Sequence, residues 1–277
     1  MADAGPFYIS GPSALGEDQS RFWSLLWLVS RIEFRLRYHG SLLGYAWSLL
    51  NPLLFFGVIY LFFTQVIEFG GDIQHFGVLL LLNIMLFSFF SEATTTSVQS
   101  LVSRERMLRT THFPRIVIPL SGVITSMLTL VTGLPVAFAY ILIDGVTPTW
   151  TWLLMPVIIA LLFAVTVGVA LILSTLYVTI RDVSLMWRVA SRALFYGSAV
   201  MYTVEYVPES WRWIMFANPI VPILTQARVW IIDPSAPSAL AAGGALGLGL
   251  SVGVFFALIG LGAWLFVRRA PRIAELL

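Results

Sequence analysis

The sequence has no cysteine, no lysine and few charges, and each shortage excludes a class of site. Without cysteine the chain forms no disulfide and no thiolate metal centre. Without lysine it cannot carry a standard phosphate-binding ATPase loop, which needs that side chain on the nucleotide phosphates. The three histidines, His39, His75 and His112, are scattered over different loops without metal-site spacing. No paired-carboxylate cluster or serine nucleophile elbow is visible. The sequence therefore predicts no catalytic centre, and no cofactor or metal bound by this chain.

Apolar residues dominate the chain instead. Of its 277 residues, 58% are hydrophobic and 11% are charged, and the mean hydropathy is +0.89, far from the average of a soluble domain. This length holds about six spans of roughly 20 residues. We predict an all-α polytopic membrane protein with a single domain over residues 21–277. Residues 1–20 have no basic start and no apolar core, which predicts a flexible cytosolic tail and no signal peptide.

A helical pattern covers residues 21–38. Its apolar residues recur three and four positions apart and so form one stripe: Phe22, Leu25, Leu26, Val29, Ile32 and Leu36. Trp23 and Trp27 lie at the boundary of this stripe, while Arg31 and Arg35 lie away from it. An amphipathic helix of this kind lies along the headgroup layer and does not cross the bilayer.

Six apolar segments of membrane length follow, at about 47–67, 76–98, 116–143, 150–178, 183–204 and 240–267. The region 205–235 is also apolar, but four prolines divide it into pieces too short to cross: Pro208, Pro219, Pro222 and Pro234. We predict an outer re-entrant hairpin of two short helices there. Glycines four apart at 243 and 247, and at 249 and 253, favour close helix contact in the last span.

The arginines are distributed unevenly over the loops. Four lie in residues 21–37, four in 104–115, three in 181–192 and three in 268–272, so that 14 of the 16 share one side. Only Arg212 and Arg228 lie in opposite loops. Basic loops mark the cytoplasmic side, which predicts six spans with both termini in the cytoplasm.

The loop 101–115 holds four of these arginines within twelve positions: Arg104, Arg106, Arg109 and Arg115. Met107, Leu108 and Phe113 add an apolar set, so that the loop can form a short helix with a docking face. Two interpretations stay open, an orientation signal alone or a handle for a partner protein. The prolines at 114 and 119, where the chain returns to the membrane, favour the handle.

Two polar features lie inside the predicted spans. The second half of the second span, from Glu92, is rich in hydroxyls and is expected to face protein or water. Arg188 and Arg192 lie four apart on one face of the fifth span, with Arg192 about 13 Å along the helix. Either both side chains reach the headgroups from a cytosolic vestibule, or they face a transport path and guide a pyrophosphate.

Four motifs resemble the membrane subunits of ABC-2 type polysaccharide exporters, and the resemblance covers nearly everything after residue 20. They are RLRYHGSLLGYAWSLLNPLL (35–54), HFPRIVIPLS (112–121), STLYVTIRDV (174–183) and NPIVPILTQAR (218–228). Four such motifs, in the same order along a chain with six predicted spans, are specific evidence for this family. Each motif alone is weak evidence. The chain departs from the family in its missing lysines and in the two arginines of span five.

The resemblance implies an assembly of two copies of this chain with two nucleotide-binding ATPase subunits, which would use ATP and magnesium. The loop would then couple to the ATPase through Arg104, Glu105, Met107, Leu108, Arg109, His112, Phe113, Pro114 and Arg115. The helix 21–38 would act as a cytoplasmic gate through Phe22, Trp23, Leu26, Trp27, Arg31 and Arg35. Spans one and five would line a channel, with candidates Tyr45, Trp47, Tyr60, Glu92, Arg188, Arg192, Tyr196 and Tyr202.

The resemblance further implies export of a lipid-linked polysaccharide across a bacterial inner membrane, with lipid and a second copy as partners and no nucleic acid. An arginine-only, alanine- and glycine-rich chain suggests a GC-rich bacterium, which makes galactan one candidate cargo. Two rival functions stay open. One is a lipid or drug exporter on the same frame. The other is an integral-membrane enzyme on polyprenyl-linked sugars, although the outer acids are dispersed: Glu68, Asp72, Asp144, Glu205, Glu209 and Asp233.

Overall fold

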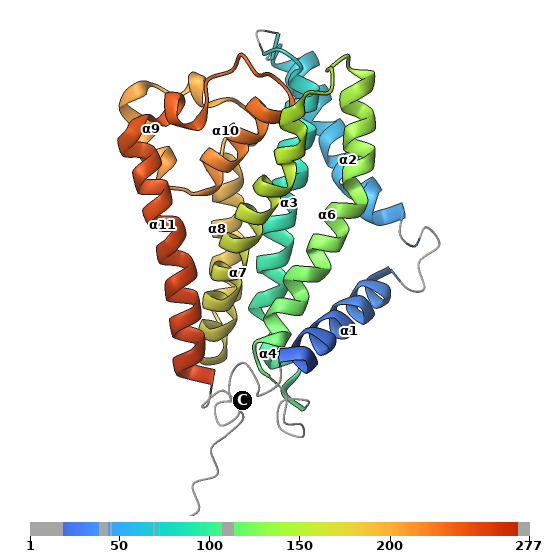
Figure 1. Cartoon of the computed structure of the whole chain (residues 1–277), viewed down its shortest axis with the longest axis vertical. Coiled ribbons are helices and arrows are strands. Elements are labelled where there is room, and N and C mark those ends of the chain that lie inside the picture. Colours follow the sequence, from blue (N-terminus) through green and yellow to red (C-terminus); the bar gives the residue numbers. More distant parts are fainter. Residues whose placement is uncertain are drawn as a thin grey trace, which may run out of the picture.

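The structure is a computed structural model that describes residues 19–38, 44, 46–68, 70–71, 73–106 and 114–270. Among these residues, five helical segments are long and apolar enough to cross a membrane, and they run beside one another between the two ends of a bundle (Figure 1). They are α2 (Ala46–Leu61) continued by the π-helical turn η1 (Phe62–Val66), α3 (Phe76–Val98), α6 (Val117–Ile143), the 3-10 turn η2 (Trp150–Leu154) with α7 (Met155–Thr179), and α11 (Ala239–Arg269). The predicted all-α polytopic fold is confirmed.

The helix in the place of the expected fifth span differs from the prediction in length. We expected residues 183–204, but α8 (Val183–Gly197) has 15 residues, about 22 Å at 1.5 Å per residue. That is short of a hydrocarbon core about 30 Å thick. The helix ends where Ala199 takes a left-handed φ of 54°. There Asn83 on α3 donates hydrogen bonds to the carbonyls of Ala199 and Val200, at 3.4 and 3.3 Å.

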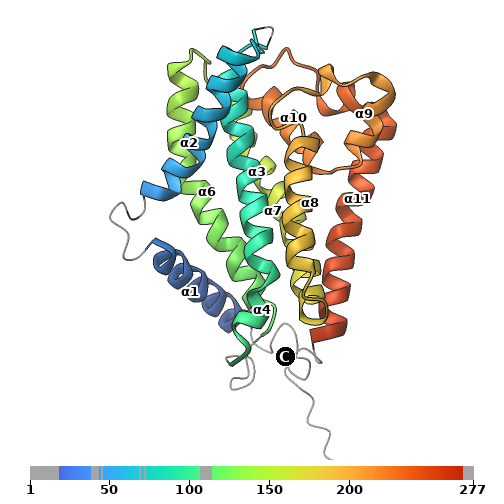
Figure 2. The same ribbon diagram turned by 180° about the vertical axis from the view of Figure 1, so that it is seen from behind.

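The region expected as a re-entrant hairpin contains the short 3-10 turn η3 (Val204–Tyr206) and two short helices, α9 (Glu209–Phe216) and α10 (Ile220–Ile231). The two helices meet at an angle of 106°. Asn218, in the break between them, donates to Ser198 Oγ at 2.7 Å and accepts from the Ile220 amide at 3.0 Å. This hydrogen-bonded break holds both helices at one end of the bundle, above the end of α8 (Figures 1 and 2).

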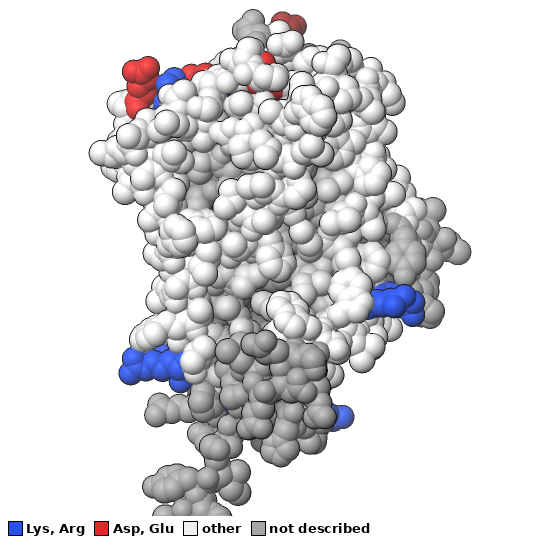
Figure 3. Space-filling view, in the orientation of Figure 1, with Lys and Arg blue, Asp and Glu red and all other residues white. Residues whose placement is uncertain are grey.

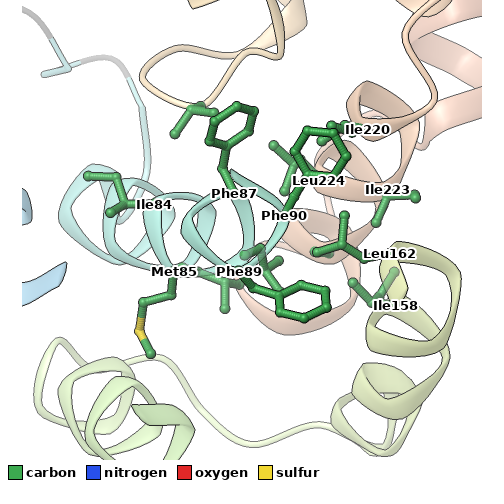
Figure 4. Close-up of a cluster of buried hydrophobic side chains, with 14 of the residues drawn as sticks. Ile84, Met85, Phe87, Phe89, Phe90, Ile158, Leu162, Ile220, Ile223 and Leu224 are labelled. Carbon is green, nitrogen blue, oxygen red and sulfur yellow. The ribbon is translucent and has the colours of Figure 1, made fainter. Parts of the chain in front are cut away.

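The central helix of the bundle is α3. It is apolar on every side over most of its length, as expected for a helix with neighbours all around it, and 18 of its 23 residues are buried. Figure 4 shows side chains of α3 projecting in different directions, with Leu162 of α7 and Leu224 of α10 packed in the same cluster. Every membrane-length element is therefore arranged around this helix or around its neighbour α7.

The helices α7 and α11 approach each other closely through glycines. A Cβ atom on Gly262 would lie 2.4 Å from the Gly168 carbonyl oxygen, so a larger residue fits there only if the two helices shift apart. The expected glycine contacts are placed differently. Gly243 and Gly247 pack against the ring of Phe216 in α9, whereas a Cβ on Gly249 or Gly253 would have no neighbour within 4 Å. The glycines of α11 therefore allow close contact with the backbone of α7 at one place and with the ring of Phe216 at another.

Charge is separated between the two ends of the molecule. On the face shown in Figure 3, most of the basic surface lies toward one end, carboxylates with some basic surface beside them lie at the other, and the belt between is uncharged. We name these the arginine end and the acidic end. α1 (Gln19–Tyr38) lies oblique to the bundle beside α6, next to the short α4 (Ser100–Ser103) at the arginine end. The described chain begins and ends at this same end.

Candidate functional site

The side of α1 that faces the bundle is more polar than the sequence predicted. Leu26 and Ser30 are fully buried, and Glu33 and Arg37 continue the same side at spacings of three and four. The predicted stripe needs correction, because Ile32 and Leu36 are 47% and 66% exposed, whereas Phe22, Leu25 and Val29 do pack inward. Four of the predicted gate residues are exposed on this chain: Trp23, Trp27, Arg31 and Arg35.

Glu33 is the point where three helical elements meet. Its carboxylate accepts a hydrogen bond from Ser121 Oγ of α6 at 2.8 Å and one from Thr125 Oγ1 at 3.5 Å. It also forms an ion pair with Arg104, the residue that directly follows α4. Arg104 in turn donates to Ser121 Oγ at 3.3 Å. A charge-assisted network of this kind fixes α1 against the start of the loop 101–115.

A second ion pair joins α1 to α3 and borders a polar cavity. Arg37 pairs with Glu92, and both side chains line a cavity of about 560 Å³ between α2, α3 and α6. The polar lining comes from all three helices, with Ser48, Asn51, Ser88, Ser126 and Thr129, and the apolar lining includes Trp47, Phe55, Met85 and Phe89. Of the predicted channel residues, the cavity brings Trp47 and Glu92 together.

The outer face of α8 carries the two arginines of interest. Ser191, on its inner side, lies with its Oγ 2.8 Å from Ser91 Oγ of α3, and Trp187 Nε1 donates to Thr94 Oγ1 at 3.1 Å. These contacts set the rotation of the helix, so that Arg188 and Arg192, each one position further along the chain, are turned away from α3 and lie exposed. Neither arginine has an ion-pair partner among the described residues.

Residues 24–231 match the family model described as ABC-2 type transporter. This chain belongs to the ABC-2 type transporter family. Two O-antigen export system permease proteins RfbA from Klebsiella pneumoniae are each 30% identical to it over 207 residues, 74% of this chain and 79% of the relative. RfbA of Myxococcus xanthus is 30% identical over 217 residues, 78% of this chain and 82% of the relative. The chain is therefore the membrane subunit of a bacterial transporter and not an enzyme.

The predicted ATPase-coupling loop of this ABC-2 type transporter is described at its two ends. Glu105 is half-buried and Arg106 exposed, and on the returning side Pro114 is half-buried while Arg115 is 6% exposed. Met107, Leu108, Arg109, His112 and Phe113 lie outside the described residues. The coupling role of this set stays a prediction.

The remaining predicted channel residues are dispersed over this subunit. Tyr60 packs in an aromatic cluster with Phe56, at a ring distance of 5.5 Å, away from the cavity. Tyr196 is 61% exposed on the arginine face of α8. Tyr202, beyond the end of α8, donates its hydroxyl to the Tyr196 carbonyl at 2.9 Å. Tyr45 lies outside the described residues.

The two arginines of the acidic end are both bonded locally. Arg228 pairs with Glu205 at 2.9 Å and with Asp233 at 3.8 Å, while Arg212 donates to the carbonyls of Val207 and Glu205. Each arginine therefore stabilises the hairpin region. This gives a structural reason for two arginines at the acidic end, where other basic residues are rare.

Sequence reasoning missed Ser30, Glu33 and Arg37 on α1, and Asn51 and Ser126 in the cavity. A signal existed for Glu33 and Arg37, since they follow Leu26 at seven and eleven positions and so share its side of a helix. The cavity residues had a weaker signal. Both are polar residues in apolar spans that carry other polar residues as well, such as Ser48 and Thr125, and polar residues in a span often face protein.

Proposed function

We propose that this chain is the channel-forming subunit of an ATP-driven exporter that moves lipid-linked polysaccharide out of the cytoplasm across the inner membrane. The observation that carries the proposal is the α8 face with Arg188, Arg192 and Tyr196 exposed together. Guanidinium groups are costly in lipid and mark water-filled paths or protein contacts. In support, the similar RfbA proteins are named for O-antigen export.

The proposed assembly pairs two copies of this chain so that their α8 and α2 helices border a common path. A polymer longer than the bilayer is thick cannot be enclosed by the protein, and it needs a continuous route. The exposed apolar face of α2 favours the same pairing, with Leu54, Val58 and Leu61 between 57% and 69% exposed. Exposed aromatic rings such as Tyr196 suit the apolar faces of sugar rings, and their hydroxyls suit the polar edges.

The proposed motor is a pair of separate ATPase subunits, since this chain has no lysine for a phosphate-binding loop. They would bind ATP and magnesium and dock at the arginine end, on the loop 101–115 and beside α1. Because basic loops stay in the cytoplasm, this end is proposed as the cytoplasmic one, with both termini. We further propose galactan as the polysaccharide that is exported, on the amino-acid composition of this chain alone.

The test uses proteoliposomes that contain this chain and its ATPase, with lipid-linked polysaccharide added outside and an enclosed glycosidase as the reporter. We expect ATP-dependent cleavage, and none with an ATPase variant unable to hydrolyse ATP. ATP-driven movement of phospholipid or drug without any polymer would favour a lipid or drug exporter. Turnover of polyprenyl-linked sugar by this chain alone would favour the enzyme and overturn the proposal.

A further inference from the structure

The cavity between α2, α3 and α6 contains more hydrogen-bonding groups than this chain uses. Ser126 is 0% exposed, lines the cavity and has an Oγ without a hydrogen-bond partner. Ser88 of α3, which is half-buried, and Asn51 of α2, which is exposed, line the same cavity, and neither has a hydrogen-bond partner in the described part of the chain. Buried polar groups in folded proteins are almost always paired. The unpaired buried hydroxyl of Ser126, with the accessible Ser88 and Asn51 beside it, therefore indicates an external partner.

The charge of the cavity restricts the chemistry of this partner. Arg37 and Glu92, its ionised side chains, are paired with each other, so the lining has no net charge. An anionic phosphate would meet no free cation, and a hydrocarbon chain would leave the buried Ser126 hydroxyl unpaired in a low-dielectric site. The groups that stay available are hydroxyls and an amide, which both donate and accept hydrogen bonds.

Aromatic side chains complete the lining. Trp47 and Phe55 are each 45% exposed and border the same cavity as the free hydroxyls. A sugar residue has this combination of surfaces, since its C–H faces pack on rings while its hydroxyls exchange hydrogen bonds at the edge. The volume of about 560 Å³ lies within the usual range for a small-molecule site.

We propose that the cavity of each subunit, between α2, α3 and α6, binds one neutral sugar residue of the transported glycan. That the sugar belongs to the cargo rests on the proposed function, whereas the site rests on the cavity itself. Asn51, Ser88 and Ser126 hydrogen-bond the sugar hydroxyls, and Trp47 packs on one face of the ring. The Arg37–Glu92 pair closes the cavity toward the arginine end.

The experiment uses the full chain in nanodiscs of phosphatidylglycerol and a photoreactive alkyl glucoside, with the diazirine on the chain carbon nearest the sugar. We expect mass spectrometry to find the label on cavity residues of α2, α3 or α6. The double variant Asn51→Leu with Ser126→Ala should reduce labelling about tenfold, as expected for two lost hydrogen bonds. Ser174→Ala is the matched control, because Ser174 is equally buried but bonds within its own helix, to Leu171.

Each outcome decides the proposal. Loss of the label in the double variant, with the control labelled normally, supports it. Equal labelling by the same alkyl chain bearing phosphocholine would assign the cavity to a lipid headgroup and overturn it, as would glucoside labelling outside the cavity or unchanged by the double variant. The proposed function is measured separately. Polysaccharide export without cavity labelling overturns only this inference, and cavity labelling without export overturns only the exporter.

Discussion

At the scale of single residues, the side chains that matter most in this transporter subunit are charged, and lipid does not solvate charge. Each of them therefore needs another partner. Glu33 and Arg104 neutralise each other at the α1 contact, and Arg37 and Glu92 do so at the cavity. Arg188 and Arg192 differ, because they have no partner among the described residues. Paired charges fix geometry, while unpaired ones require water, substrate or a second subunit.

The Glu33–Arg104 pair gives the first prediction. Glu33→Gln should lower the free energy of unfolding by about 1–3 kcal/mol, because hydrogen bonds to a charged group are lost in a site where the two side chains are 17% and 29% exposed. Thermal unfolding in detergent measures the change, and the swap Glu33→Arg with Arg104→Glu should recover part of it. The control Glu209→Gln, at a side chain 89% exposed, should have no effect. Equal losses at both positions would contradict a role for the pair.

Arg192→Leu gives the second prediction. If Arg192 guides the diphosphate of the cargo, the variant should hydrolyse ATP normally in the assembled exporter while export falls by about tenfold or more, a loss of at least about 1.4 kcal/mol of barrier stabilisation. Arg268→Leu is the control, because Arg268 lies near the end of α11 over the Trp264 ring, at 5.2 Å, and should keep export. Normal export by the Arg192 variant would support a side chain that only reaches the headgroups.

At the scale of elements, the bundle depends on two kinds of helix contact. α3 is held by large apolar side chains on all sides, whereas α7 and α11 approach backbone to backbone through glycines. Without a hydrophobic force between helices in lipid, such close packing supplies much of the attraction. α11 is thereby placed beside α7, and through Gly243 and Gly247 it also supports Phe216 of the hairpin.

Gly262→Ala gives the third prediction. The added methyl group would meet the Gly168 carbonyl at 2.4 Å, and such overpacking should lower the free energy of unfolding by about 1–3 kcal/mol. Gly253→Ala lies on the same helix with no neighbour within 4 Å, and alanine there should be neutral or stabilising, given its better helix propensity. Thermal unfolding of both variants in detergent checks this. A Gly262 variant as stable as the Gly253 variant would show that α7 and α11 are not in contact.

At the scale of the whole molecule, the proposed function requires that movement pass from the arginine end to the transport path. The Arg104 side chain links the proposed ATPase-docking loop to α1, and α1 is linked through Arg37 to α3 and the cavity. These two ion pairs form a continuous physical connection between the loop and the interior of the bundle. A connection of this kind is a hypothesis about coupling until both of its ends are tested.

The fourth prediction therefore concerns the loop. Met107→Ala with Phe113→Ala, or Arg109→Glu alone, should uncouple export from ATP hydrolysis, because an apolar and cationic docking face is lost while no residue of the bundle changes. The measurement is export per ATP hydrolysed, alongside co-purification of the ATPase. The exposed Arg181→Gln, outside the loop, is the control. Wild-type export with the ATPase still bound would place the docking site elsewhere.

The sequence alone determined the class of the protein, five of its membrane-length helices, the helix α1 without its inward-facing side, and the broken hairpin. These features follow from local composition, since a span is recognised by the length of its apolar run and a break by its prolines. The end of α8 was misplaced by seven residues because nothing local stops that helix. A contact from Asn83, more than a hundred positions away, holds the turn at Ala199.

Only the tertiary structure decided which polar residues meet. Ser121 lies 88 positions from Glu33, and Arg104 lies 71 positions from it, so no spacing rule could pair them. The cavity likewise forms from three helices. Nothing in the sequence indicates that the polar residues of these helices line one cavity. Helix periodicity tells which residues share a face, but the rotation of each helix against its neighbours is set by packing. That rotation placed Glu33 inside, turned Arg192 outward and left Ser126 without a partner.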